Sequence, residues 1–222
     1  MQTTEHFENH LPYILSTPDH IDPNKNYDLI ILLHGYGASM HDLAGLAPAI
    51  NSEDYIYLFI NAPIELNIGY GQTGYAWVPV GDSSEIEKTA EMINSTIKAY
   101  LDQCELQISK LYIGGFSQGG MMTIHVGLSS KINFSGAIVL SSRMYPEHEI
   151  KFTVNHPDNT KIFMVHGIQD SVLPVEDGRN TKNHLIQLGF DLEYHEYNMA
   201  HEITLEVIED LKNWLIHCCK SS

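Results

Sequence analysis

Five short, almost unbroken apolar segments are the feature that most restricts the fold of this chain. They are separated by longer segments in which apolar residues recur every three or four positions, as on one face of a helix. Strands that are apolar along their whole length are typical of a parallel sheet buried on both faces. The apolar segments are DLIILL (28–33), YIYLFI (55–60), KLYIGG (110–115), GAIVL (136–140) and KIFMV (161–165). Their alternation with helices predicts an α/β fold with a mostly parallel central sheet and helices on both faces.

The segments with helical spacing define the other half of the predicted fold. They are 41–50, 83–103, 118–129, 177–188 and 202–217. The clearest is 83–103, where apolar residues recur from Ile86 to Leu101 and where Ser83 and Ser84 are the predicted caps. An antiparallel strand around residues 11–15 is weakly indicated. Because the 222 residues contain no repeat, linker or low-complexity segment, we expect one domain spanning 1–222.

Composition and charge exclude several classes of function. Hydrophobic residues make up 43% and charged residues 18%, as in a folded globular protein. With 12 Lys and Arg against 28 Asp and Glu, the net charge of -16 argues against nucleic acid as a partner. The polar N-terminus and the lack of a long apolar run argue against export and against stable membrane insertion. The three cysteines suggest no disulfide framework, so we expect a cytoplasmic location. The 13 histidines are scattered and form no metal-binding motif, so no metal is predicted.

The stretch from Gly115 to Gly119, GFSQG, matches the G-x-S-x-G pattern of a nucleophile elbow. A serine at the tip of a sharp strand-to-helix turn has a strained backbone, and glycines on either side let the strand and the helix approach each other. The following helix directs its N-terminal amides toward the reacting centre, so the Gln118 amide is a predicted oxyanion donor. The bare pattern also occurs in flexible turns. It is the strand before it and the helix after it that favour Ser117 as a nucleophile.

The loop after the first apolar segment, His34-Gly35-Tyr36-Gly37, occupies the place of a second oxyanion donor. Its glycines allow the backbone to curl beneath a substrate carbonyl, and we therefore predict that the Tyr36 amide is that donor. The alternative is an ordinary β-α turn in which His34 only makes local hydrogen bonds.

A serine nucleophile needs an imidazole base and a carboxylate that fixes the tautomer of the imidazole. In the α/β-hydrolase fold, which is the fold that the G-x-S-x-G elbow indicates, the chain order is Ser, Asp or Glu, then His. Asp170 directly follows the KIFMV segment, and His201 follows the 192–197 run and precedes a helix. We therefore predict Asp170 as the acid and His201 as the base.

Other residues compete for these two roles. His195 is a rival base, but it lies within a strand pattern and is less able to reach above the sheet. Glu176 and Asp177 are rival acids that look more like the start of a helix. Asp170 itself could be no more than a turn or helix cap, and His201 one of many unremarkable histidines.

These motifs together resemble the carboxylesterase and phospholipase family that includes the acyl-protein thioesterases, over nearly the whole chain. The matching landmarks are LLHGYG (32–37), INAP (60–63), GYAW (74–77), GFSQGG (115–120), HGIQDSVLP (166–174) and MAHEI (199–203). The resemblance implies a single-domain hydrolase of small acyl esters or thioesters that uses no cofactor and that can form a homodimer. Two departures, Ala200 where the family often has Gly and Ala38 where many members have Asp, weaken the transfer of a protein-depalmitoylating role.

The same resemblance suggests where an acyl chain would bind. The stretch from Ile64 to Val80 occupies the place of the family's acyl-binding loop, although its aromatic residues could equally plug the edge of the core. A second set of candidates follows the VLSS strand end and the HGIQD loop. The predicted substrate-binding residues are Leu66, Ile68, Tyr70, Tyr75, Trp77, Met144, Tyr145 and Leu173.

The sequence thus predicts a serine hydrolase that cleaves carboxylic esters or thioesters through an acyl-enzyme. A catalytically silent α/β-hydrolase-fold protein that binds an apolar ligand is the alternative, and an intact triad argues against it because a binder need not keep every part. A phospholipase acting at a lipid surface is a further rival. The negative charge disfavours anionic membranes for such an enzyme but permits zwitterionic ones.

Overall fold

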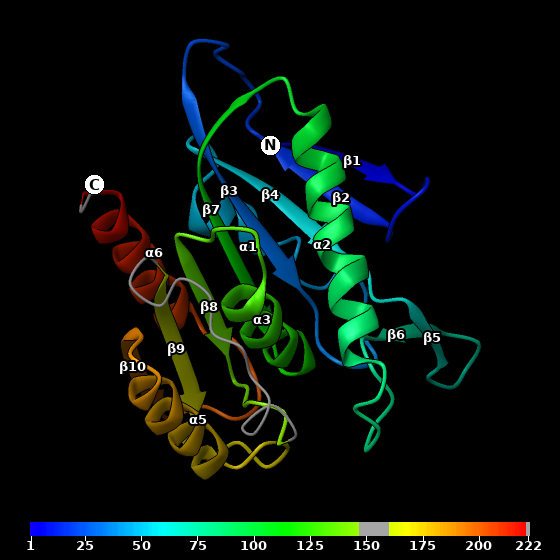
Figure 1. Cartoon of the computed structure of the whole chain (residues 1–222), viewed down its shortest axis with the longest axis vertical. Helices are drawn as coiled ribbons and strands as arrows, with labels where there is room; N and C mark the ends of the chain where they lie inside the picture. Colours follow the sequence, from blue (N-terminus) through cyan, green and yellow to red (C-terminus); the bar gives the residue numbers. More distant parts are fainter. Residues whose placement is uncertain (147–159, 221–222) are drawn as a thin grey trace.

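The computed structural model describes residues 1–146 and 160–220, and its centre is a sheet of eight strands (Figure 1). The strand order is β1-β2-β4-β3-β7-β8-β9-β10. The strands are β1 (Gln2–His6), β2 (Tyr13–Thr17), β3 (Asn26–Leu33), β4 (Tyr55–Ile60), β7 (Gln107–Phe116), β8 (Gly136–Leu140), β9 (Lys161–Gly167) and β10 (Asp191–Tyr197). From β4 to β10 all neighbours are parallel, whereas β1 and β2 pair in antiparallel fashion at one edge. The predicted mostly parallel α/β-hydrolase sheet is confirmed.

Helices cover both faces of this sheet. They are α1 (Leu46–Ile50), α2 (Ile86–Gln103), α3 (Gln118–Ser129), α5 (Val175–Gln187) and α6 (Leu205–Lys220). Buried residues of α2, α3 and α5 belong to one hydrophobic cluster, and those of α1 and α6 belong to the other. Each helix therefore lies on the face of the sheet to which its apolar stripe packs.

Strand β3 shows why its sequence is apolar throughout. Leu29, Ile31 and Leu33 belong to the cluster under α2 and α3, while Ile30 and Leu32 belong to the cluster under α6. Successive side chains of a strand point to opposite faces, so a strand between two helical layers must be apolar at every position.

Some local predictions were wrong. The helix that starts near residue 83 begins at Ile86 with Glu85 as its N-cap residue, and no side chain caps it, so neither Ser83 nor Ser84 has the predicted role. Helix α1 covers only the last part of 41–50, because residues before Leu46 form turns. A hairpin of β5 (Ile64–Asn67) and β6 (Thr73–Ala76), separate from the main sheet, was not predicted.

None of the helices in the described ranges has the length and apolar character needed to cross a bilayer. The fold places the candidate site residues at one edge of the sheet. The carboxyl ends of the parallel strands lie side by side, and in open α/β sheets ligands bind outside that edge. The loops after β3, β7, β8, β9 and β10 carry the residues described next.

Candidate active site

Ser117 lies in the sharp turn between β7 and α3, with φ of 54° and ψ of -119°. A positive φ is uncommon for a residue with a side chain and is kept only where the surroundings hold it. Its amide donates a hydrogen bond to Leu140 O at 3.0 Å, and its carbonyl accepts one from Ser142 Oγ at 2.6 Å. The neighbouring strand β8 and the loop after it therefore stabilise the strained turn.

The glycines on either side of Ser117 lie where backbones meet. A Cβ atom on Gly115 would be 2.4 Å from the carbonyl carbon of Gly119, and one on Gly119 would be 2.0 Å from Leu33 O. Neither contact can be relieved by moving a flexible side chain, because the atoms met are backbone atoms. The two glycines are therefore required for α3 to start against β7 and β3.

The two amides predicted as oxyanion donors lie at the ends of the same two strands. Gln118 is the first residue of α3, so its N–H has no partner within the helix. Tyr36 lies in the turn after β3, which is held by hydrogen bonds from Gly37 N to Tyr75 O and from Tyr75 N to Ala38 O, both 2.8 Å. Among the described residues, neither the Tyr36 amide nor the Gln118 amide has a hydrogen-bond acceptor. Both remain available to a ligand.

A buried network joins these two turns. The Gln118 side chain accepts a hydrogen bond from Trp77 N and donates one to Val78 O, both at 2.8 Å. The Trp77 indole N–H donates to His34 O at 2.8 Å. The predicted role of Gln118 was that of its backbone amide alone. Its buried side chain also fixes the segment that lies beside the elbow.

The His34 side chain extends this network, and its hydrogen bonds define which ring nitrogen carries the proton. Its Nε2 accepts a hydrogen bond from Ala62 N at 3.1 Å, so the proton is on Nδ1, which donates to Gly35 O at 2.8 Å. Burial lowers the pKa of His34 to about 4, although the hydrogen bond to Gly35 works in the opposite direction. The ring is therefore neutral wherever the protein is near neutral pH.

This burial predicts a specific loss of stability in acid. The unfolded chain takes up a proton on His34 near pH 6.5, whereas the folded chain does so only near pH 4. The stabilisation is complete above pH 6.5 and decreases as the pH falls toward 4, by about 3 kcal/mol in total. In urea unfolding, the gap in unfolding free energy between the wild type and His34→Gln should narrow by this amount from pH 7 to pH 4. A gap that does not change with pH would contradict the prediction.

Asp170, in the turn after β9, meets His201, in the loop after β10. Asp170 Oδ2 accepts a hydrogen bond from His201 Nδ1 at 2.6 Å, and Oδ1 accepts hydrogen bonds from the amides of Val172 and Leu173, both at 2.8 Å. Burial alone would raise the pKa of Asp170, but these three hydrogen bonds outweigh it and lower the pKa below its usual value. Asp170 is therefore an ionised carboxylate that orients the imidazole.

The His201 ring packs beside the elbow. Its centroid lies 4.7 Å from that of Phe116, the residue before Ser117. The described residues contain no hydrogen bond between the Ser117 hydroxyl and His201, and such bonds are often long until a substrate tightens the site. The structure thus brings the carboxylate and the imidazole together and places them next to the serine turn.

A second histidine, to which the sequence assigns no role, lies next to the Asp170 carboxylate. His166 is fully buried, its Nε2 donates a hydrogen bond to Leu173 O at 2.9 Å, and the same nitrogen is 3.6 Å from Asp170 Oδ2. The HGIQD motif gave this residue no distinguishing signal. Of the rivals of the two predicted residues, His195 pairs with Glu193 at 2.7 Å on β10. Asp177 is in the first turn of α5, where its carboxylate is 3.6 Å from Arg143 Nε.

A cavity of about 300 Å³ opens beside Ser117. Of the predicted substrate-binding residues, Tyr145 and Leu173 line it, and so do both oxyanion residues, Tyr36 and Gln118. Four further apolar residues line it. Pro79 and Val80 belong to the predicted 64–80 segment, although neither was singled out in it. Met121 and Val172 were not predicted, because no sequence pattern marks them.

The other predicted substrate-binding residues do not line this cavity. Trp77 and Met144 are buried in the hydrophobic core, and the Trp77 indole packs against the loop after β3, where it bonds to His34 O. Leu66, Ile68 and Tyr70 lie on β5 and its turn, where Tyr70 is fully exposed. Tyr75 lines a different cavity of about 560 Å³ together with Glu65 and Thr73.

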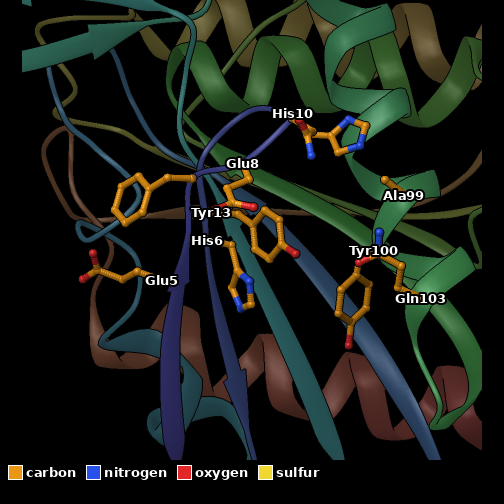
Figure 2. A pocket seen from close by; sticks show the side chains of 10 residues that line it. Glu5, His6, Glu8, His10, Tyr13, Ala99, Tyr100 and Gln103 are labelled. Carbon is orange, nitrogen blue, oxygen red and sulfur yellow. The ribbon is translucent and has the colours of Figure 1, made fainter.

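A further cavity of about 420 Å³ lies between the β1–β2 connection and α2 (Figure 2). It is lined by His6, His10 and Tyr13 on one side and by Tyr100 and Gln103 on the other. None of its lining residues comes from the loops that carry Ser117, Asp170 or His201, so it is separate from the site. Within residues 1–146 and 160–220, no three His, Cys, Asp or Glu side chains are grouped as metal ligands would be.

Comparison with known proteins agrees with this geometry. The sequence profile of the phospholipase/carboxylesterase family matches residues 21–219. The acyl-protein thioesterase 1 of Emericella nidulans is 28% identical over 216 residues, which cover 86% of this chain and 90% of that protein. The protein of the same name from Kluyveromyces lactis is 27% identical over 218 residues, covering 89% and 94%. A carboxylesterase from Mesorhizobium loti, only 15% identical, shares the fold with a TM-score of 0.80 over 96% of this chain and 98% of its own. The chain therefore belongs to the phospholipase/carboxylesterase family and is an ester-hydrolysing enzyme of the α/β-hydrolase fold.

Proposed function

We propose that Ser117, His201 and Asp170 are the catalytic triad of this hydrolase and that the Tyr36 and Gln118 amides form its oxyanion hole. The observation that carries the proposal is the 2.6 Å hydrogen bond between His201 and a buried, ionised Asp170 next to the strained Ser117 turn. That arrangement costs backbone strain and the burial of a carboxylate, which a passive binding protein has no need to maintain.

In the proposed reaction, His201 Nε2 removes the proton from the Ser117 hydroxyl as Oγ attacks the acyl carbonyl. The two amides stabilise the oxyanion of the tetrahedral intermediate. The acyl C–O or C–S bond breaks, the alcohol or thiol leaves with the proton from His201, and the acyl group stays on Oγ. Water activated by the same imidazole then releases the carboxylic acid and restores the serine.

The substrate proposed is a small acyl ester or thioester. Relatives named acyl-protein thioesterase 1 support inclusion of thioesters. We also propose a cytoplasmic location, supported by the free thiol of Cys104. We further propose that the protein can form homodimers, which sedimentation velocity measures directly.

A fluorophosphonate probe tests the proposal. The Ser117 hydroxyl should displace fluoride and form a covalent phosphonyl adduct, and mass spectrometry should find that adduct on the peptide that contains Ser117. The reaction depends on a folded site, because an isolated serine hydroxyl is a poor nucleophile without its base.

The control is the same protein unfolded in urea, which should remain unlabelled. A His201→Ala variant should be labelled about 100-fold more slowly or worse, since the base is gone. A folded wild-type protein that resists the probe, or an adduct on another serine, would refute the proposed role of Ser117 and favour the silent ligand-binding protein.

A further inference from the structure

One charged side chain lines the otherwise uncharged cavity beside Ser117. The cavity of about 300 Å³ is enclosed largely by apolar side chains, among them Val80, Met121, Val172 and Leu173. Arg143, in the loop directly after β8, lines the same cavity and is the only described lining residue with a charge at neutral pH. Pockets of this kind take their specificity from the few polar groups placed among apolar ones.

The hydrogen-bond donors of Arg143 are mostly unused by the protein. Its Nη1 donates to Met144 O at a long 3.3 Å, and its Nε is 3.6 Å from Asp177 Oδ2, too far for a hydrogen bond. Nε is buried and has no hydrogen-bond partner in the described part of the chain. The pair with Asp177 is partly exposed, with 31% and 38% of the two side chains accessible, so it is a weak interaction.

The other arginine of the sequence shows how this chain satisfies a structural guanidinium. Arg179 donates from Nε and Nη2 to the two carboxylate oxygens of Glu196, each at 2.7 Å, and from Nη1 to Glu176. Its planar fork is therefore fully engaged in a bidentate pair. Arg143 has the same five donors in a less exposed place, yet it lacks such a partner.

A guanidinium that lines an apolar cavity and has only a distant carboxylate partner can gain close, charge-assisted hydrogen bonds from an anion that enters the cavity. The whole chain has a net charge of -16, which repels anions in general. An anionic substrate therefore needs a local positive charge more in this protein than in a neutral one. A local cation beside the nucleophile would counter that repulsion for a substrate carrying a carboxylate. The planar carboxylate is also the group that matches the arginine fork in two parallel hydrogen bonds.

We propose that Arg143 binds a carboxylate of the substrate, so that the preferred substrates are esters or thioesters that carry a free carboxylate as well as the scissile acyl group. This inference rests on the proposed function of Ser117. The carboxylate belongs either to the acyl part or to the leaving group, and the two are tested separately.

The acyl arm compares the ethyl half-esters of glutaric and adipic acids with their ω-carboxamides, which have the same size without the charge. The leaving-group arm compares the butanoyl ester of glycolate with that of glycolamide. Hydrolysis is measured as acid release in a pH-stat. For each pair the readout is kcat/KM for the carboxylate substrate divided by kcat/KM for the carboxamide. The ratio cancels any general damage that a variant causes to the site.

We expect the wild type to favour the carboxylate by about 10- to 100-fold in one arm, the range of a charge-assisted hydrogen-bonded pair. Arg143→Gln should reduce that ratio to near one, and Arg143→Lys should leave an intermediate ratio because it keeps the charge but not the fork. Arg179→Gln, the matched control outside the cavity, should keep the wild-type ratio.

A wild-type ratio near one in both arms, or a ratio that Arg143→Gln leaves unchanged, would overturn the carboxylate site. Failure of the proposed function looks different. In that case the neutral ethyl butanoate would be hydrolysed just as well by Ser117→Ala as by the wild type, whatever the ratios are.

Discussion

Ser117→Ala is expected to lower kcat for a short p-nitrophenyl ester by about 10⁴-fold or more. The variant removes the only atom that could carry the acyl group in the proposed reaction. The oxyanion amides of Tyr36 and Gln118 would remain, so a small residual rate above that of water is expected. Because the change deletes a single oxygen and retains a Cβ at φ of 54°, the elbow should keep its shape.

The matched control for this loss is Ser95→Ala. Ser95 is exposed on α2 and belongs to none of the site loops. Its replacement should leave turnover unchanged, and circular dichroism should give the same spectrum for both variants and the wild type. If Ser117→Ala retained more than a tenth of wild-type turnover, the ester would be cleaved by some other group and the proposed mechanism would fail.

Asp170→Asn is expected to lower kcat by about three to four orders of magnitude, and the hydrogen bonds explain why. Asp170 Oδ1 accepts two backbone amides, so in the variant the amide oxygen would stay there and the NH₂ group would face His201. That NH₂ can only donate, and it would bind the unprotonated Nδ1 of the ring. The proton would then be on Nε2, which could no longer accept the proton of Ser117.

The same substitution at Asp177 serves as its control. Asp177, a rival acid by sequence, lies in the first turn of α5, and Asp177→Asn should change kcat for a neutral ester less than about threefold. Thermal unfolding should show that both variants are folded. A rate for Asp170→Asn within tenfold of the wild type would mean that Asp170 does not hold the tautomer of His201.

The main parts of the fold were predictable because they depend on local periodicity. Strand β3 is apolar at consecutive positions, and helix α2 is apolar at every third or fourth, so the two periods identify a parallel sheet between helical layers. The order of Ser117, Asp170 and His201 was also readable, since each follows a strand whose end reaches the same edge of the sheet. The α3 bounds of 118–129 matched because glycines at 115 and 119 fix the turn in which the helix starts.

The lining of the cavity was not predictable. Met144 and Arg143 are neighbours in one loop, and Met144, which is apolar, was the predicted pocket residue. In the structure, Met144 is in the core with its amide bound to Thr181 Oγ1, while Arg143 lines the cavity. Trp77 was chosen for the same reason and is likewise buried, because His34 O and Gln118 Oε1, both distant in sequence, accept its two N–H groups.

The sequence alone determined the order of strands and helices, the strained serine turn and the chain order of the three proposed catalytic residues. These depend on side-chain period and on backbone sterics, which act over a few residues. The tertiary structure alone decided which side chains of each loop enter the core and which line the cavity. Those outcomes depend on packing and hydrogen bonds between residues far apart in the chain, and no local pattern records them.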